Sequence, residues 1–176
     1  MKLTKKQATI KYCAYCLLIV IADLMQNVGG LWFEIGGARC FFVIPVAVIL
    51  GIDEDEKTAA LLGFFAGLLW DCVARQHMGF NCIFLMLLCF VISSFVSYLF
   101  RPTYWICALS AVFTVFLYCV IYWLLFMAIV HSEGSVQTIA SFYIPSALYT
   151  SVMTLALCAV IMPLKRKLNK EVEFEK

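Results

Sequence analysis

Six apolar stretches, most of them close to the length needed to cross a bilayer, alternate with short polar or charged segments along the chain. A membrane-spanning helix needs about 20 residues, because each residue rises about 1.5 Å and the hydrocarbon core is about 30 Å thick. The chain is 64% hydrophobic and its mean hydropathy is +0.96, which is more apolar surface than a soluble domain of 176 residues can bury. We therefore predict an all-α, polytopic membrane protein built as a six-transmembrane-helix bundle.

The predicted spans form a single membrane domain over residues 1–162, and a charged cytoplasmic tail follows over residues 163–176. The spans cover residues 8–28, 37–52, 58–76, 80–100, 104–130 and 139–162. Span 37–52 is the shortest, and Pro45 inside it predicts a kink. We interpret the acidic run from Asp53 to Glu56 as a solvated connector. Span 104–130 carries aromatic residues near both ends, which is typical of interfacial belts.

The basic residues predict how the bundle is oriented. An even number of spans places both termini on one side, and eleven of the thirteen Lys and Arg residues fall there. Only Arg39 and Arg75 fall on the other side. Because basic residues are retained in the cytoplasm, both termini are expected to be cytoplasmic.

The span that begins near Thr58 carries a ridge of small residues at a four-residue spacing. Ala59, Gly63 and Gly67 lie on this ridge, and the same spacing then reaches Asp71 and Arg75. Four residues advance a helix by about 400°, so these positions share one slowly drifting face. Small residues let a neighbouring helix approach closely. A carboxylate within hydrocarbon is costly and therefore marks a functional or structural site.

Polar side chains are predicted to form a layer in the outer half of the membrane. Asp23 and Asp71 lie at similar depths, about 18–20 Å from the cytoplasmic ends of their spans. Arg39 can reach the same level, Arg75 lies one turn beyond Asp71 and can pair with it, and Asn81 lies slightly further out. Three interpretations stay open for this layer: structural pairs at helix ends, an outward-facing pocket or partner surface, and a proton relay. The relay is disfavoured because the cytoplasmic half offers no acidic residue to continue it.

Motifs for self-contained catalysis are lacking in the sequence. It has no GxSxG, HExxH, P-loop or GxGxxG motif. No basic patch suggests nucleic acid, and we expect no cofactor and no metal. Cys13 and Cys16 form a CxxC pair inside an apolar span, where packing is the favoured interpretation over metal or redox use. A membrane-embedded enzyme acting on a lipid-linked substrate is a weaker alternative, with Asp71 and His77 as its candidates.

The segment from Gly63 to Val91 resembles the rod-shape-determining protein family MreD. In that family a span reads roughly G-F-x-x-G-L-x-x-D, and a short outer turn and a glycine follow. Gly63, Gly67, Asp71 and Gly79 fall on these positions, together with Phe64 and Leu68. The overall length and the number of spans are also similar to that family.

The resemblance implies a non-catalytic component of the bacterial cell-wall elongation complex, or elongasome, that maintains rod shape and takes part in peptidoglycan synthesis. Its implied partners are an MreC-like protein and, indirectly, the MreB filament and the glycan polymerase–transpeptidase pair. The family is also similar in fold to the substrate-binding S components of energy-coupling-factor transporters. An S component that carries a vitamin is therefore the alternative function, and the polar layer of Asp23, Arg39, Arg75 and Asn81 favours it.

Overall fold

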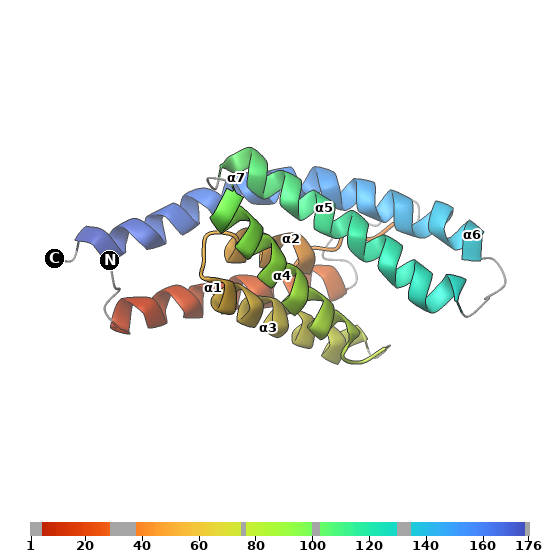
Figure 1. Cartoon of the computed structure of the whole chain (residues 1–176), viewed down its shortest axis with the longest axis horizontal. Coiled ribbons are helices and arrows are strands. Elements are labelled where there is room, and N and C mark those ends of the chain that lie inside the picture. Colours follow the sequence, from red (N-terminus) through yellow and green to blue (C-terminus); the bar gives the residue numbers. More distant parts are fainter. Residues whose placement is uncertain (1–4, 29–37, 75–76, 100–102, 130–134, 175–176) are drawn as a thin grey trace.

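The computed structural model describes residues 5–28, 38–74, 77–99, 103–129 and 135–174, and the regular structure in these ranges is helical (Figure 1). In chain order the elements are α1 (Lys5–Asn27), α2 (Val43–Gly51), α3 (Glu56–Ala74), α4 (Phe80–Leu99), α5 (Tyr104–Trp123), the π-helical turn η1 (Leu124–Ala128), α6 (Ser135–Thr138), the π-helical turn η2 (Ile139–Tyr143) and α7 (Ile144–Phe174). No strand occurs within the described ranges, and the all-α prediction is confirmed.

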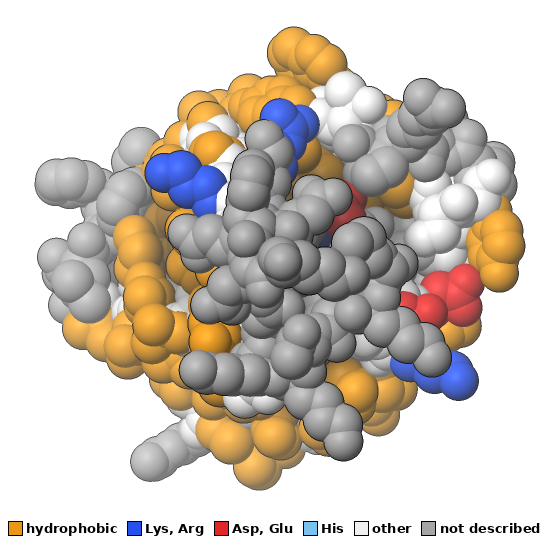
Figure 2. Space-filling view, turned by 90° about the vertical axis from the view of Figure 1, so that its left-hand side faces the viewer, with side chains coloured by type: hydrophobic (Ala, Val, Ile, Leu, Met, Phe, Trp, Pro, Cys, Tyr) orange, Lys and Arg blue, Asp and Glu red, His pale blue; other side chains and the backbone are white. Residues whose placement is uncertain are grey.

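Within the described residues, five helical stretches are long and apolar enough to cross a membrane, namely Ala8–Asn27, Glu56–Ala74, Phe80–Tyr98, Tyr104–Met127 and Ile139–Asn169. Their outward faces carry large apolar side chains, such as Leu61, Leu109 and Val152, each about two-thirds exposed. Figure 2 views the molecule from one end and shows hydrophobic side chains around much of its circumference. A surface of this kind is stable against lipid and not against water, so the chain is a polytopic membrane protein.

The beginning of α1 and the end of α7 lie at the same end of the molecule, which we call the termini end (Figure 1). Two ion pairs join these helices to the loop that follows α2 at this end. Lys11 of α1 pairs with Glu54 at 2.6 Å, and Lys165 of α7 pairs with Asp53 at 3.1 Å. The connection between α3 and α4 lies at the opposite end, which we call the distal end.

The second predicted span, residues 37–52, differs most from the structure. Its helix, α2, has only nine residues, and all nine are buried. Nine residues rise about 14 Å, which is less than half of a bilayer core. Pro45 is the third residue of α2, in the first turn, where its missing N–H costs nothing. A helix that began earlier would need that N–H, so Pro45 helps to set where the helix starts instead of kinking it.

The chain nevertheless returns toward the termini end through this segment. The amide of Val43, at the start of α2, donates to Oε1 of Gln26 near the end of α1 at 3.1 Å. Glu54, just after α2, reaches Lys11 near the start of α1. Residues 43–54 therefore run antiparallel to α1, along fifteen of its residues or about 22 Å. α2 is a buried half-helix that contacts α1, α3, α4, α5 and α7.

The last helix also differs from the prediction. We expected a span over residues 139–162 and then a charged tail, but α7 continues through Pro163 to Phe174. Lys165, two residues beyond that proline, is buried and donates to the carbonyl oxygens of Ile49 and Leu50. Lys165 of the expected tail is therefore packed against the bundle, whereas Pro163 and Leu164 are exposed. Pro145 lies at the start of α7, but α6, η2 and α7 follow one another without a gap, so its missing N–H falls within a continuous helical stretch, directly after the π-helical turn η2.

Candidate functional site

The small-residue ridge of α3 is the contact surface for α4 and α2. A Cβ atom added at Gly67 would lie 2.5 Å from Cα of Cys82, and one added at Gly63 would lie 2.8 Å from the carbonyl carbon of Leu85. Neither distance is attainable for real side chains, so only glycine permits this approach of α4. Ala59, one turn earlier on α3, contacts Gly51 of α2. A Cβ atom added at Gly51 would lie 3.2 Å from the Cβ atom of Ala59. Helices α4 and α2 of the same chain therefore cover the ridge.

Asp71 ends this ridge and holds the start of α4. Its Oδ2 accepts hydrogen bonds from the amides of Gly79 at 2.9 Å and Cys82 at 3.0 Å, and its Oδ1 accepts one from Nδ2 of Asn81 at 2.8 Å. The two amides are among those that a helix leaves unsatisfied in its first turn. A carboxylate there satisfies them and also faces the positive end of the helix dipole. Asp71, only 3% exposed, therefore caps α4 from a neighbouring helix.

The hydrogen bonds around Asp71 extend to α5 through the side chains of Asn81 and Tyr118. Asn81, whose amide group donates to Asp71, accepts a hydrogen bond at its Oδ1 from the Tyr118 hydroxyl at 2.8 Å. Asn81 and Tyr118 are both buried. Because each amide group and hydroxyl has a partner, this line of bonds fixes the positions of α3, α4 and α5 at the distal end.

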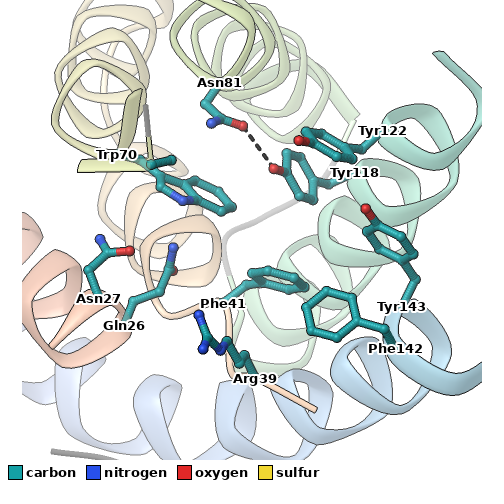
Figure 3. Close-up of a pocket in the computed structure, with 11 residues that line it drawn as sticks. Gln26, Asn27, Arg39, Phe41, Trp70, Asn81, Tyr118, Tyr122, Phe142 and Tyr143 are labelled. Carbon is teal, nitrogen blue, oxygen red and sulfur yellow. Dashed lines mark hydrogen bonds between the residues drawn. The ribbon is translucent and has the colours of Figure 1, made fainter. Parts of the chain in front are cut away.

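A cavity of about 350 Å³ lies at the distal end beside this network, and we call it the distal cavity (Figure 3). It is bounded by the end of α1, the segment before α2, the end of α3, the start of α4, the later part of α5, and η2. Six of its lining side chains are aromatic and four are polar; the lining residues are Gln26, Asn27, Arg39, Phe41, Trp70, Ala74, Asn81, Tyr118, Tyr122, Phe142 and Tyr143. In Figure 3, Arg39 and Phe41 lie across the cavity from Asn81.

Hydroxyl groups of α7 hold the segment that carries Arg39 and Phe41. The amide of Arg39 donates to Oγ of Ser146 at 3.1 Å, and the amide of Phe41 donates to Oγ1 of Thr150 at 3.0 Å. This segment is not helical, so its amides have no helical carbonyl oxygens to bond, and the two hydroxyls accept their hydrogen bonds instead. Both hydroxyls are fully buried. The wall of the cavity is therefore fixed by the bundle and not left as a loop.

The polar layer expected from the sequence is brought together only in part. Arg39 and Asn81 line the distal cavity. Asp23 is buried outside the lining and accepts a hydrogen bond at 2.7 Å from Nδ2 of Asn27, which does line the cavity. Asp71 supports the cavity through Asn81 but is not part of its lining. Arg75, and with it the expected pair with Asp71, lies outside the described residues.

Asp71 and His77, the candidate residues for a membrane-embedded enzyme, bind different partners. Asp71 is held by its three donors, whereas Nδ1 of His77 lies 2.9 Å from the Tyr122 hydroxyl. The His77 ring also stacks on Phe126, with centroids 3.6 Å apart. Within the described part of the chain, no three His, Cys, Asp or Glu side chains are grouped as metal ligands.

Sequence reasoning missed a second polar cluster, at the termini end. Glu54 was interpreted as part of a solvated connector, yet it is buried, pairs with Lys11 and accepts a hydrogen bond from the Tyr15 hydroxyl at 3.2 Å. Lys165 is equally buried. The sequence did carry one indication of this cluster: Lys11 and Tyr15 of α1 are four residues apart and therefore share a face of the helix.

Comparison with known families matches residues 7–168 to the family described as MreD, rod shape-determining protein MreD. No match was found among curated proteins or among solved structures. The matched range begins in α1 and ends in α7, so it includes both the ridge of α3 and the distal cavity.

Proposed function

The chain belongs to the MreD family of rod shape-determining proteins, and on that premise we propose that it is a non-catalytic scaffold of the bacterial cell-wall elongation complex. The observation that carries the proposal is the family match over residues 7–168. The family description names a role in cell shape and no reaction. Five apolar helices make the chain a multi-pass membrane protein, so this role is exercised from within a membrane.

Its proposed partners are an MreC-like protein and, through it, the MreB filament and the glycan polymerase–transpeptidase pair. Gly63 and Gly67 are covered by α4, which argues that partner helices bind other faces of the bundle. The proposed location is the inner membrane with both termini cytoplasmic. The termini end supports this orientation, because the basic residues near both termini fall on the side where α1 begins and α7 ends.

The proposed role of Gly63, Gly67, Asp71 and Gly79 is to build the bundle. The two ridge glycines allow α4 to approach α3, and Asp71 caps α4 through the amide of Gly79. A partner contact at Gly63, Gly67 or Asp71 would need surface that α4 already occupies. Gly79 precedes α4, and a Cβ atom added there would meet nothing within 4 Å. The three buried positions then act on partners only by holding the helices that meet them.

The scaffold proposal is tested in a rod-shaped host that depends on this chain for its shape. Gly67→Leu should abolish rod shape and co-purification with MreC, because the larger side chain forces α4 away from α3. Leu68→Ala is the matched control, since Leu68 is 43% exposed on the lipid-facing side of the same turn. Normal rods and intact MreC binding in the Gly67→Leu strain would contradict the proposal.

A second candidate function is the S component of an energy-coupling-factor type vitamin transporter, with the fold of such components. The distal cavity favours it, because S components need a site for a small molecule. Co-purification with an ATPase module instead of MreC would support this candidate. Co-purification with MreC alone would support the scaffold.

A further inference from the structure

We propose that the distal cavity binds an uncharged sugar ring, a role that goes beyond the scaffold function. The cavity volume of about 350 Å³ is at the lower end of the range for small-molecule sites, roughly 300–1,000 Å³. Its lining combines aromatic side chains with a few polar groups, as such sites usually do. The chemistry of the ligand follows from one buried hydroxyl, two amide side chains and a continuous aromatic wall.

Tyr143 places a buried hydroxyl in the wall of the cavity without a hydrogen-bond partner. Of the two other tyrosines in the lining, Tyr118 donates to Asn81 at 2.8 Å, and the hydroxyl of Tyr122 lies 2.9 Å from Nδ1 of His77. Tyr143 is only 6% exposed, and its hydroxyl has no hydrogen-bond partner among the described residues. In Figure 3 this hydroxyl points from η2 toward Tyr118 and Tyr122. Buried polar groups almost always have a partner, so water or a ligand inside the cavity must supply it.

Two amide side chains near the end of α1 add further uncharged groups. Gln26 uses its Oε1 to accept a hydrogen bond from the amide of Val43, which leaves its two N–H groups without a partner among the described residues. Asn27 uses its Nδ2 to donate to Asp23, which in the same way leaves its carbonyl oxygen as an acceptor. Figure 3 shows both side chains across the cavity from Tyr143. A ligand that bonds to both sides needs polar groups around its rim, as a sugar ring has.

The charged groups near the cavity are engaged within the protein. Asp23 accepts a hydrogen bond from Asn27, and Asp71 accepts one from Asn81. Arg39 also has an interaction of its own. A charged ligand would have to displace these contacts or remain unpaired, and an unpaired charge that is taken out of water is costly. The cavity therefore favours a ligand without net charge.

The ring follows from the aromatic wall. Ring centroids are 5.8 Å apart for Phe41 and Trp70, 5.1 Å for Trp70 and Tyr118, and 5.6 Å for Tyr118 and Tyr122. Tyr143 continues this wall at 6.0 Å from Tyr122. Water gains little from aromatic faces, whereas the C–H face of a sugar packs on them and its hydroxyls still reach the polar groups. A sugar therefore uses both parts of the lining.

The wall of the cavity is preformed. Ser146 and Thr150 hold the segment that carries Phe41, and the π-helical turn η2 supplies Phe142 and Tyr143. Turns of this kind occur often at functional sites. A wall that is already ordered loses little entropy when a ligand binds.

The test uses soluble probes that differ in one property at a time. Glucose and N-acetylglucosamine are uncharged sugars, glucuronate adds a negative charge, and protonated glucosamine adds a positive charge. Glycerol has hydroxyls without a ring, and nicotinamide is an uncharged ring with polar groups mainly on one side. The purified full chain is placed in phosphatidylcholine nanodiscs, because many detergents carry sugar headgroups of their own. Each probe is titrated by calorimetry, and the midpoint of thermal unfolding is followed.

We expect saturable binding and a raised midpoint with at least one uncharged sugar. Binding of the charged sugars, glycerol and nicotinamide should be at least about tenfold weaker. A sugar on a lipid is tested in discs that contain glucosyldiacylglycerol. A raised midpoint in these discs without a response to soluble sugars assigns the ligand to a lipid headgroup, and a response to the soluble sugars assigns it to a solute. No response to any sugar, or equal or stronger binding of a charged sugar, glycerol or nicotinamide, overturns the proposal.

Variants then locate the binding. Tyr143→Phe removes only the buried hydroxyl and should weaken binding of the responding sugar about fivefold, since one hydrogen bond between uncharged groups is lost. Without a sugar this variant should unfold at the native temperature or above it, because a buried hydroxyl without a partner adds no stability. Tyr98→Phe is the matched control, since Tyr98 is 79% exposed near the end of α4, and neither its affinity nor its unfolding temperature should change.

Phe142→Leu tests the aromatic wall, because it keeps apolar volume but removes a ring, and it should also weaken binding. Native affinity in both Tyr143→Phe and Phe142→Leu overturns the assignment to this cavity. A lower unfolding temperature of Tyr143→Phe without a sugar would show that the hydroxyl already has a partner within the chain, which also contradicts the proposal.

Discussion

Nζ of Lys165 lies 2.8 Å from the carbonyl oxygen of Leu50, 115 positions earlier in the chain. The same amine also donates to the carbonyl of Ile49 and pairs with Asp53. It thus supplies a positive group at the carbonyl end of α2, where the helix dipole is negative. The last residues of α2 are buried, so the Lys165 amine satisfies two of the helix's end carbonyls where water does not reach them.

Lys165→Met should destabilise the bundle by about 3 kcal/mol, because it leaves two carbonyls and a carboxylate without their buried cation. Reversible unfolding in mixed micelles measures this free energy. Lys167→Met is the matched control, since Lys167 is exposed two residues further along the same helix. Equal stability of the two variants would show that the amine is dispensable for α2.

Lys11 and Glu54 should show an energetic coupling of about 1–2 kcal/mol in a double-mutant cycle. Both side chains are only 7% exposed, so either single substitution leaves the other charge buried and unpaired. We expect Lys11→Met and Glu54→Leu each to lose more than half of the free energy of unfolding that the double variant loses. The two single losses then add up to more than the loss in the double variant. Strict additivity of the two losses would mean that the pair does not interact.

The long helices could be predicted because their apolar runs are local and continuous. The length of α2 could be anticipated only from the place of Pro45 within its helix, and its burial depends on five other helices. The ridge of α3 could be predicted from the four-residue spacing of its small residues. The residues that pack on it could not, because Gly67 contacts Cys82 across a helical hairpin whose register the sequence leaves open.

The distal cavity was anticipated only as a polar layer. Aromatic residues near both ends of span 104–130 were assigned to interfacial belts. The inward placement of Trp70 and Tyr118, which are 6% and 4% exposed, was not predicted. The partner of Tyr118 is Asn81, 37 positions away, and no local pattern identifies such a pair. Buried charges such as Glu54 were missed for the same reason, since a carboxylate in an acidic run looks solvated until its distant partner is known.

Gly67→Ala should destabilise the bundle although alanine is the better helix former. Alanine gains about 1 kcal/mol in helix propensity, but its Cβ would overlap the backbone of Asn81 and Cys82. Overpacking costs roughly 1–3 kcal/mol, and a clash with backbone atoms is at the upper end because backbone yields little. A cost of about 3 kcal/mol leaves a net loss of about 2 kcal/mol. The free energy of unfolding is compared with that of Leu68→Ala, for which no such overlap exists. A Gly67→Ala variant that is more stable than the native chain would contradict the close approach of α4.

Asp71→Ala should lower the stability of the bundle by about 3 kcal/mol, because the half-buried amide of Gly79, the buried amide of Cys82 and the Asn81 amide group lose their acceptor. Asp71→Asn keeps one acceptor oxygen but loses the charge that faces the α4 dipole, so its loss should be smaller, about 1–2 kcal/mol. Asp55→Asn is the control, since Asp55 is an exposed carboxylate at the termini end. Amide hydrogen exchange should show faster exchange at Cys82 in Asp71→Ala than in the native chain. Exchange at the native rate there, with stability equal to that of the Asp55 variant, would mean that the first turn of α4 does not depend on the carboxylate.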